Sequence, residues 1–112
     1  MVLVQSVPRL KRRGDFERVF RWGRVYGGAL IVVRLYATGE TTRVGVAVGK
    51  RIGCAVVRNR LRRRWREVVR LGPGLRPGFD VVIVVRATSD GAVAAALRRA
   101  WTDALERARL ML

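Results

Sequence analysis

One stretch, from Arg43 to Arg70, constrains this chain more than any other: RVGVAVGKRIGCAVVRNRLRRRWREVVR. It begins with the alternation of a β-strand, passes through a basic loop with two glycines, and then predicts a helix. At about 100° per residue, the apolar side chains of that helix share one side, as an amphipathic helix requires. They are Val57, Leu61, Trp65, Val68 and Val69. Arginines cover most of the remaining surface, and Glu67 is its only acid. Such a helix repels itself, so we expect a polyanion beside it.

The loop before this helix has residues that favour phosphate binding. Gly49 and Gly53 let the backbone turn and approach a phosphate group closely. Asn59, near the first helical turn, either caps the helix or hydrogen-bonds a ligand. The loop lacks the GK[ST] ending and the nearby acidic metal ligand of a nucleoside triphosphate loop. Its charge comes from Lys50, Arg51 and Arg58.

The whole chain shares this positive charge. It has 24 Lys and Arg against 8 Asp and Glu, a net charge of +16 in 112 residues. A surface this cationic gains affinity for nucleic acid by releasing counterions, and it loses that affinity steeply as salt rises. Half of the residues are apolar, which favours a packed globule over a disordered tail, and the length fits one domain over residues 1–112. A GC-rich genome also favours Arg over Lys, so the net charge is the stronger indication of a partner.

The first half of the chain predicts a basic arm, a helix and a hairpin. Residues 1–13 end in a basic segment that either orders on RNA or stays solvated. A helix is expected to start at Asp15, or just before it, and to stop at Gly23, and Asp15 can cap its open amide groups. Two apolar strands, Ala29 to Ala37 and Thr42 to Gly49, flank a turn and predict an antiparallel hairpin.

The second half predicts one more strand and one more helix. The Val-rich run from Phe79 to Ala87 fits a strand buried on both faces. Ser89 and Asp90 signal a helix start, and Ala92 to Arg109 has an amphipathic pattern. Its apolar stripe is Val93, Leu97, Trp101, Ala104 and Leu105. The expected fold is an α+β, two-layer α/β sandwich in the order α-β-β-α-β-α, for which a right-handed βαβ crossover is the default.

Three aromatic side chains each have two interpretations. Phe16 and Phe20 lie at i and i+4, where core side chains are the most economical explanation, although exposed aromatics also stack on bases. Tyr36 shares a strand face with Arg34, and it either forms a basic, aromatic sheet surface or covers a sheet edge.

The polypeptide offers little catalytic chemistry. It has no histidine, and its single cysteine, Cys54, excludes an internal disulfide and a zinc site. Its eight acids are explained by helix ends, a turn, a strand and helix surfaces, so we expect no catalytic residue and no metal ligand in this chain. No apolar run approaches the roughly 20 residues of a membrane span, and no signal peptide is apparent. We expect a cytoplasmic protein with no membrane partner and no small-molecule substrate.

The central stretch closely resembles the RNR signature of the bacterial ribonuclease P protein subunit. The resemblance rests on Lys50-Arg51-Ile52-Gly53, Ala55-Val56, Arg58-Asn59-Arg60 and Arg62-Arg63. Weaker matches follow the family's order and spacing, so that the resemblance covers most of the chain. They are Arg9-Leu10, Asp15-Phe16, Val19-Phe20, Asp80 and Arg86.

This resemblance implies a fold and an activity. The fold is a ribosomal-protein-like domain with an uncommon left-handed βαβ crossover. The activity is removal of the 5′ leader from precursor tRNA, in which an RNA subunit performs the metal-dependent hydrolysis and the protein assists. The implied partners are ribonuclease P RNA and precursor tRNA. The implied cofactor is Mg²⁺, held by the RNA partner and the substrate and not by dedicated protein ligands.

Carried over residue by residue, the resemblance assigns two sites. The leader-binding cleft would hold Phe16, Phe20 and Tyr36. Two positions depart from the family pattern: Arg62 stands where lysine is common and keeps the charge, and Arg34 stands where many members have a strand aromatic. The RNA-subunit contact would be made by Lys50, Arg51, Arg58, Asn59, Arg60, Arg62 and Arg63.

Two other RNA- or DNA-binding functions fit the composition. One is a structural ribosomal-type RNA-binding protein or RNA chaperone without a nuclease role, and the other is a nucleoid-type DNA binder. Only the RNR motif and the paired phenylalanines favour the ribonuclease P subunit over them.

Overall fold

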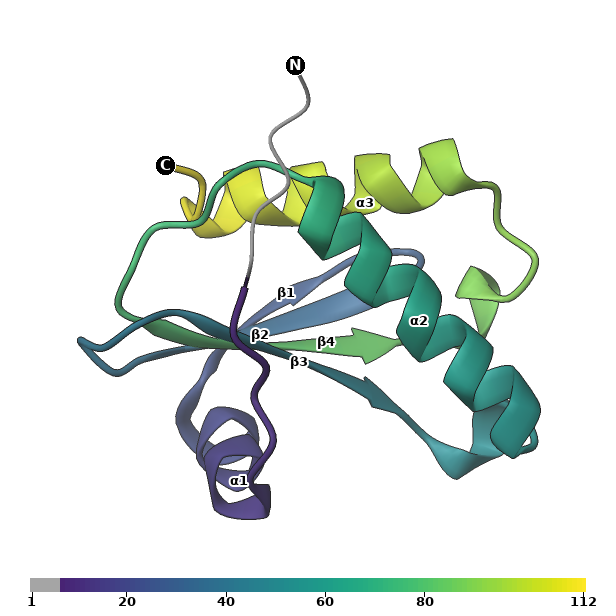
Figure 1. Cartoon of the computed structure of the whole chain (residues 1–112), viewed down its shortest axis with the longest axis horizontal. Coiled ribbons are helices and arrows are strands. Elements are labelled where there is room, and N and C mark those ends of the chain that lie inside the picture. The colour runs from purple at the N-terminus through teal and green to yellow at the C-terminus, as the bar shows by residue number, and fades with distance from the viewer. Residues whose placement is uncertain (1–6) are drawn as a thin grey trace.

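A four-stranded sheet carries helices on both of its faces in the computed structural model, which describes residues 7–112 (Figure 1). The helices are α1 (Arg13–Trp22), α2 (Ala55–Leu71) and α3 (Ala94–Ala108), with short 3₁₀ turns η1 (Lys50–Ile52) and η2 (Ala87–Ser89). The strands are β1 (Arg24–Gly27), β2 (Ile31–Ala37), β3 (Arg43–Val48) and β4 (Phe79–Val85). The predicted α+β fold is therefore confirmed, with one more strand than expected.

The strands lie in the order β1-β2-β4-β3, so β4 separates β2 from β3. The predicted antiparallel hairpin of β2 and β3 is therefore wrong. β2 pairs with β4 instead, with Ile31 opposite Val85. The physical reason lies in β4 itself: its apolar run buries both faces, which is possible only at the centre of the sheet. β1 was not predicted, because it is a short, mostly exposed edge strand without an apolar pattern.

The β3–α2–β4 unit has the uncommon handedness. β3 and β4 are adjacent and parallel, with Val44 opposite Val81. In Figure 1 β3 lies nearer the viewer than β4, and α2 returns the chain above the sheet. The crossover is therefore left-handed, as the resemblance implied and against the right-handed default.

The main core lies between the sheet and the helices α2 and α3. Trp65 and Trp101 are its largest buried side chains, which confirms the predicted stripe of α2 and the core role of Trp101. The expected start of the last helix is corrected. Ser89 is buried and donates a hydrogen bond to the Leu30 carbonyl at 2.7 Å, and α3 begins only after Val93, which is exposed.

A smaller core lies on the opposite face, beneath α1. Its buried members are Leu10, Val19 and Val82. Leu10 arrives there because the chain before α1 pairs with the edge of β3. The Leu10 amide donates to the Val44 carbonyl at 3.1 Å, and the Val44 amide donates to the Pro8 carbonyl at 3.0 Å. Residues 1–6 of the predicted basic arm lie outside the described residues, whereas residues 8–10 are docked on the sheet and not a solvated arm.

Within residues 7–112, no helix is both long enough and apolar enough to cross a membrane.

Candidate RNA-binding surfaces

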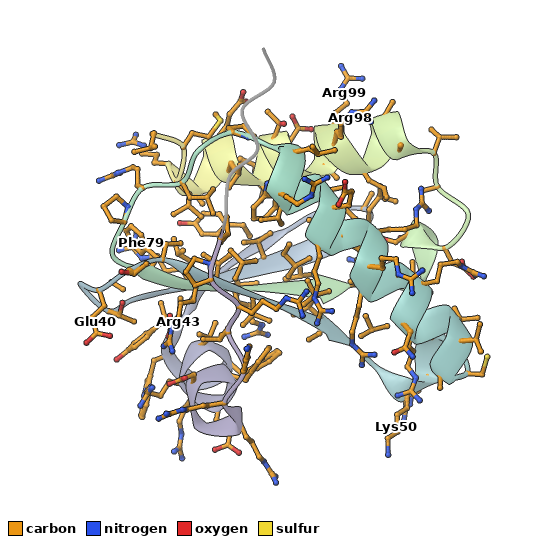
Figure 2. The ribbon with its side chains drawn as sticks, viewed as in Figure 1. Glu40, Arg43, Lys50, Phe79, Arg98 and Arg99 are labelled. Atoms are coloured by element: carbon orange, nitrogen blue, oxygen red, sulfur yellow. The ribbon has the colours of Figure 1, made fainter. Side chains whose placement is uncertain are left out.

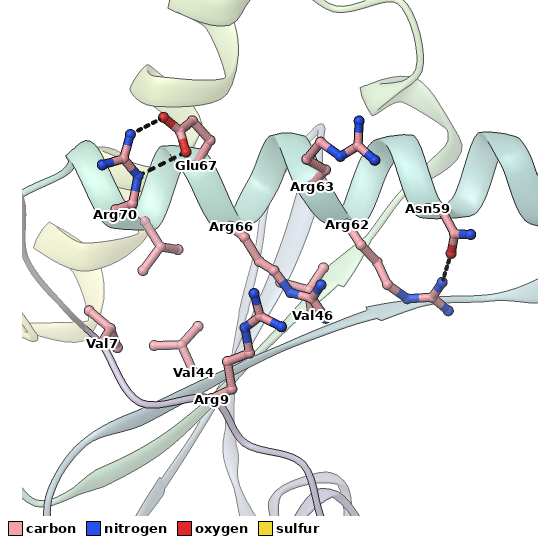
Figure 3. A pocket seen from close by; sticks show the side chains of 11 residues that line it. Val7, Arg9, Val44, Val46, Asn59, Arg62, Arg63, Arg66, Glu67 and Arg70 are labelled. Carbon is pink, nitrogen blue, oxygen red and sulfur yellow. Dashed lines mark hydrogen bonds and ion pairs between the residues drawn. The ribbon is translucent and has the colours of Figure 1, made fainter.

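A groove of about 490 Å³ runs between α2 and the docked segment at the edge of β3 (Figure 3). Its floor is apolar and is formed by Val7, Val44, Val46 and Val69. Its walls are almost entirely cationic, because α2 turns one side of its cylinder toward it. The polar lining residues are Arg9, Asn59, Arg62, Arg63, Arg66, Glu67 and Arg70.

Arg9, Arg62 and Arg66 lie along this groove without an acid between them (Figure 3). The pKa of Arg66 is lowered, first because partial burial removes water from its charge and then because Arg9 and Arg62 lie close to it. The acid in the wall, Glu67, is already bonded to Arg70, with the Arg70 Nε donating to Oε2 at 2.9 Å. Within residues 7–112, Arg9, Arg62 and Arg66 form no ion pair. A polyanion would relieve this repulsion.

Only part of the predicted RNA-subunit contact lines this groove. Asn59, Arg62 and Arg63 do, and the Arg62 guanidinium donates to the Asn59 side-chain oxygen at 3.0 Å. Lys50 and Arg51 are exposed on η1, before the first turn of α2.

The remaining two predicted arginines lie elsewhere on α2. The Arg60 guanidinium donates a hydrogen bond to the Asp90 carboxylate at 2.9 Å, on a different side of the helix. This ion pair compensates the charge of Arg60. Arg58 is half-buried, and its Nε has no hydrogen-bond partner among the described residues. Of the seven predicted residues, three therefore line the groove, Lys50 and Arg51 lie before it on η1, and Arg58 and Arg60 lie elsewhere on α2.

Three groove arginines, Arg9, Arg66 and Arg70, were not predicted as site residues. Arg66 follows Arg62 by four residues, so helical periodicity alone could have added it to the set. Arg9 could not have been found this way, because its place in the groove depends on the pairing of residues 8–10 with β3.

A second surface lies along α1. Phe16 and Phe20 line a shallow groove of about 560 Å³ together with Arg13, Glu17 and Arg21. Phe20 is 41% exposed, so the interpretation of Phe20 as a core residue is wrong. Phe16 is half-buried and packs against the smaller core, whose fully buried member on α1 is Val19.

Arg34 belongs to this same surface. Its guanidinium lies 5.1 Å from the centre of the Phe20 ring and donates to the Phe20 carbonyl at 3.1 Å. Arg34 thus places a stacked cation beside an exposed aromatic ring. Tyr36 is half-buried against the smaller core and lies opposite Asp80 in the sheet, and it is not among the residues that line the α1 groove.

Neither surface carries an evident metal site. Within residues 7–112, no group of three or more His, Cys, Asp or Glu side chains could hold a metal ion. Cys54 is exposed at the start of α2, where the backbone amides of Val57 and Val56 lower the pKa of its thiol. Cationic side chains on the first surface and an exposed aromatic ring on the second are the features with which proteins bind phosphate groups and stack on bases.

Known proteins are similar to this chain in both sequence and fold. The family model "Ribonuclease P" matches residues 5–109. The ribonuclease P protein component of Symbiobacterium thermophilum is 40% identical over 111 residues, covering 96% of each chain, and that of Herpetosiphon aurantiacus is 37% identical over 109 residues, covering 96% of this chain and 89% of its own. Among solved structures, the RNase P protein of Thermotoga maritima has a TM-score of 0.79 at 30% identity, covering 88% of this chain and 96% of its own. That of Staphylococcus aureus shares the fold with a TM-score of 0.83 at 22% identity, covering 96% of this chain and all of its own (100%). The chain therefore belongs to the ribonuclease P protein family.

Proposed function

We propose that this chain is the protein subunit of ribonuclease P, and that it assists a catalytic RNA in removing the 5′ leader from precursor tRNA. Membership of the family implies a part in tRNA processing and an RNA partner. The observation that carries the proposal is the groove beside α2, which Arg9, Arg62 and Arg66 line without an acid between them. The protein would work in the cytoplasm, with its RNA partners.

The α2 groove and η1 would bind the RNA subunit. Guanidinium groups hold phosphate oxygens in pairs of hydrogen bonds, and Asn59 adds a polar side chain to the same wall. The apolar floor keeps the wall arginines from being hydrated on every side, which strengthens their attraction to phosphate. Lys50 and Arg51 would extend the contact beyond the first turn of α2.

The α1 surface would take the leader of precursor tRNA. An exposed ring such as Phe20 stacks on an unpaired base of any sequence. Arg34, held against that ring, would meet the phosphate of the stacked nucleotide. Phe16 contributes the inner end of the groove, and Tyr36 supports the sheet behind it.

Mg²⁺ would be bound by the RNA partner and the substrate. Cationic side chains beside the RNA junction would reduce the phosphate repulsion that the metal ions otherwise have to screen. The protein would thus lower the Mg²⁺ concentration that cleavage requires, without binding the metal itself.

Reconstitution tests this proposal. Bacterial ribonuclease P RNA and a precursor tRNA are combined at low Mg²⁺ with and without the protein. We expect cleavage at the mature 5′ end only when both components are present. A lack of stimulation, with the same RNA active at high Mg²⁺, would indicate a ribosomal or chaperone role instead. Cleavage by the protein alone would contradict the absence of catalytic groups.

A further inference from the structure

A buried ionic link joins α1 to two strands of the sheet. Arg43, the first residue of β3, donates from Nε to Asp80 Oδ1 at 2.9 Å and from Nη2 to Asp80 Oδ2 at 2.8 Å. Its remaining terminal nitrogen, Nη1, donates to Asp15 Oδ2 on α1 at 3.1 Å. One guanidinium therefore connects α1, β3 and β4.

The burial of this link separates it from an ordinary surface ion pair. Asp80 is 1% exposed and Asp15 is 5% exposed, and they are the buried acids of residues 7–112. The chain has only 8 acids for its 24 basic residues, yet two of them share one arginine. The pKa of Arg43 is raised, chiefly by its hydrogen bonds to Asp80, which shows that the charged form is the stabilised one.

Apart from this link, α1 is held by the smaller core and by a further side-chain hydrogen bond to the sheet. The core beneath it is small, with Leu10, Val19 and Val82 as its buried members. Within residues 7–112, side-chain hydrogen bonds tie α1 to the sheet at two points: Arg43 to Asp15 near the start of the helix, and Arg34 to the Phe20 carbonyl near its end. Asp15 also bonds Arg18, but that contact stays within α1 and does not attach the helix to anything.

The link lies next to the residues that would hold the leader. Phe16 follows Asp15 directly, and its ring occupies the space above Gly45, two residues beyond Arg43 on the same face of β3. A shift of the start of α1 would therefore move the Phe16 ring, which lines the α1 groove, relative to the sheet.

We propose that Asp15 and Arg43 are positioning residues for the leader, because they set where α1, and with it Phe16 and Phe20, lies over the sheet. This inference rests on the proposed role of the α1 surface in leader binding. It predicts that breaking the Asp15–Arg43 contact weakens leader recognition without touching the α2 groove, which lies on the other face of the sheet (Figure 1).

The test uses Asp15→Asn in the reconstituted holoenzyme. This variant keeps the side-chain shape and leaves the bidentate Arg43–Asp80 pair in place, so we expect the protein to fold. Asp103→Asn is the matched control, because it makes the same chemical change at an exposed position on α3. Arg43→Lys is the second variant, since an ammonium group keeps the charge and loses the fork that bridges two carboxylates.

Two quantities are measured for each variant. The first is the ratio of the holoenzyme's affinities for precursor tRNA and for mature tRNA, and the second is the affinity of the protein for the RNA subunit. For Asp15→Asn and Arg43→Lys we expect the preference for precursor tRNA to fall by on the order of tenfold, as when a hydrogen bond between charged groups is removed. Binding of the RNA subunit should stay within about twofold, and Asp103→Asn should change neither.

Amide hydrogen exchange over residues 13–22 of the free protein is measured in parallel. The inference requires faster exchange in α1 of Asp15→Asn, with α3 unchanged. Unchanged leader preference in both variants, or unchanged exchange in α1, overturns it. If the unaltered protein itself shows no preference for precursor tRNA, the proposed leader role fails, and the exchange data still decide whether the link holds α1.

Discussion

At the scale of single residues, exposure separates structural aromatics from those available to a ligand. Trp65 and Trp101 are buried, whereas Phe20 keeps 41% of its surface exposed with a guanidinium stacked on it. The spacing of Phe16 and Phe20 could not distinguish these cases, because a buried pair and a groove-lining pair both recur at i and i+4. The difference comes from where α1 crosses the sheet, which depends on contacts distant in the sequence.

Phe20→Ala tests the ligand role of the exposed ring. We expect a reduced preference for precursor tRNA over mature tRNA, because the base loses its stacking partner at a cost of about 1–3 kcal/mol. Stability should fall by less than the roughly 3–5 kcal/mol of a buried Phe, as measured by thermal unfolding. Trp22→Ala is the control, since Trp22 is 61% exposed on the same helix and does not line the groove. Equal losses of leader preference in the two variants would contradict the assignment.

Gly45→Ala tests the packing of the Phe16 ring against β3. A Cβ at this position would lie 2.5 Å from Phe16 Cζ and 3.1 Å from Leu10 Cβ, too close for either group to stay in place. We expect a loss of about 1–3 kcal/mol in the free energy of unfolding, measured by denaturant titration, with weaker leader binding. Gly27→Ala is the matched strand variant, because its Cβ would meet nothing within 4 Å. A Gly45→Ala protein as stable as the Gly27→Ala protein would show that Phe16 does not depend on this position.

At the scale of elements, the sequence predicts what periodicity controls. The apolar stripe of α2, the burial of β4 on both faces, and the core face of α3 from Leu97 to Leu105 are all confirmed. The pairing of β2 with β3 was wrong because adjacency in sequence says nothing about a strand that arrives later and inserts between them. Only the helical wall of the α2 groove could be predicted, because it follows from the 3.6-residue repeat. The opposite wall, with Arg9, depends on strand pairing.

Arg62→Gln combined with Arg66→Gln tests whether that groove binds phosphate. We expect weaker binding to the RNA subunit and a slope of log K against log salt that is shallower by roughly one unit for each phosphate group that the protein no longer neutralises. Filter binding over a salt series measures both quantities. The control is Arg98→Gln with Arg99→Gln, which removes the same charge from α3 and lies away from the groove (Figure 2). Equal changes in slope for the two pairs would show that net charge, and not the groove, determines binding.

At the scale of the whole molecule, charge acts in opposite directions on folding and on binding. A net charge of +16 on 112 residues repels itself in the compact state, and the same charge attracts RNA. The ion pairs of residues 7–112 involve only some of the arginines, and the α2 groove concentrates several of the remainder.

Salt should therefore stabilise the free protein and weaken its complex. Raising NaCl from about 0.1 M to about 1 M shortens the screening length from about 10 Å to about 3 Å. We expect the Tm of the free protein to rise over this range, by differential scanning fluorimetry, while its affinity for RNA falls. A Tm that falls with added NaCl would mean that attractive ion pairs, such as Arg43–Asp80, outweigh the repulsion.

The position of β4 also sets when this chain can fold during translation. β4 joins the β1–β2 pair to β3, yet it is the last strand that the ribosome makes. Until residue 85 has emerged, β2 can pair only with β1, and β3 only with the segment at residues 8–10. Most of a strongly basic chain is thus synthesised beside ribosomal RNA before its sheet can close. A product that ends before Phe79 lacks the strand on which both halves depend, so a prematurely terminated chain stays unfolded and exposed to proteolysis.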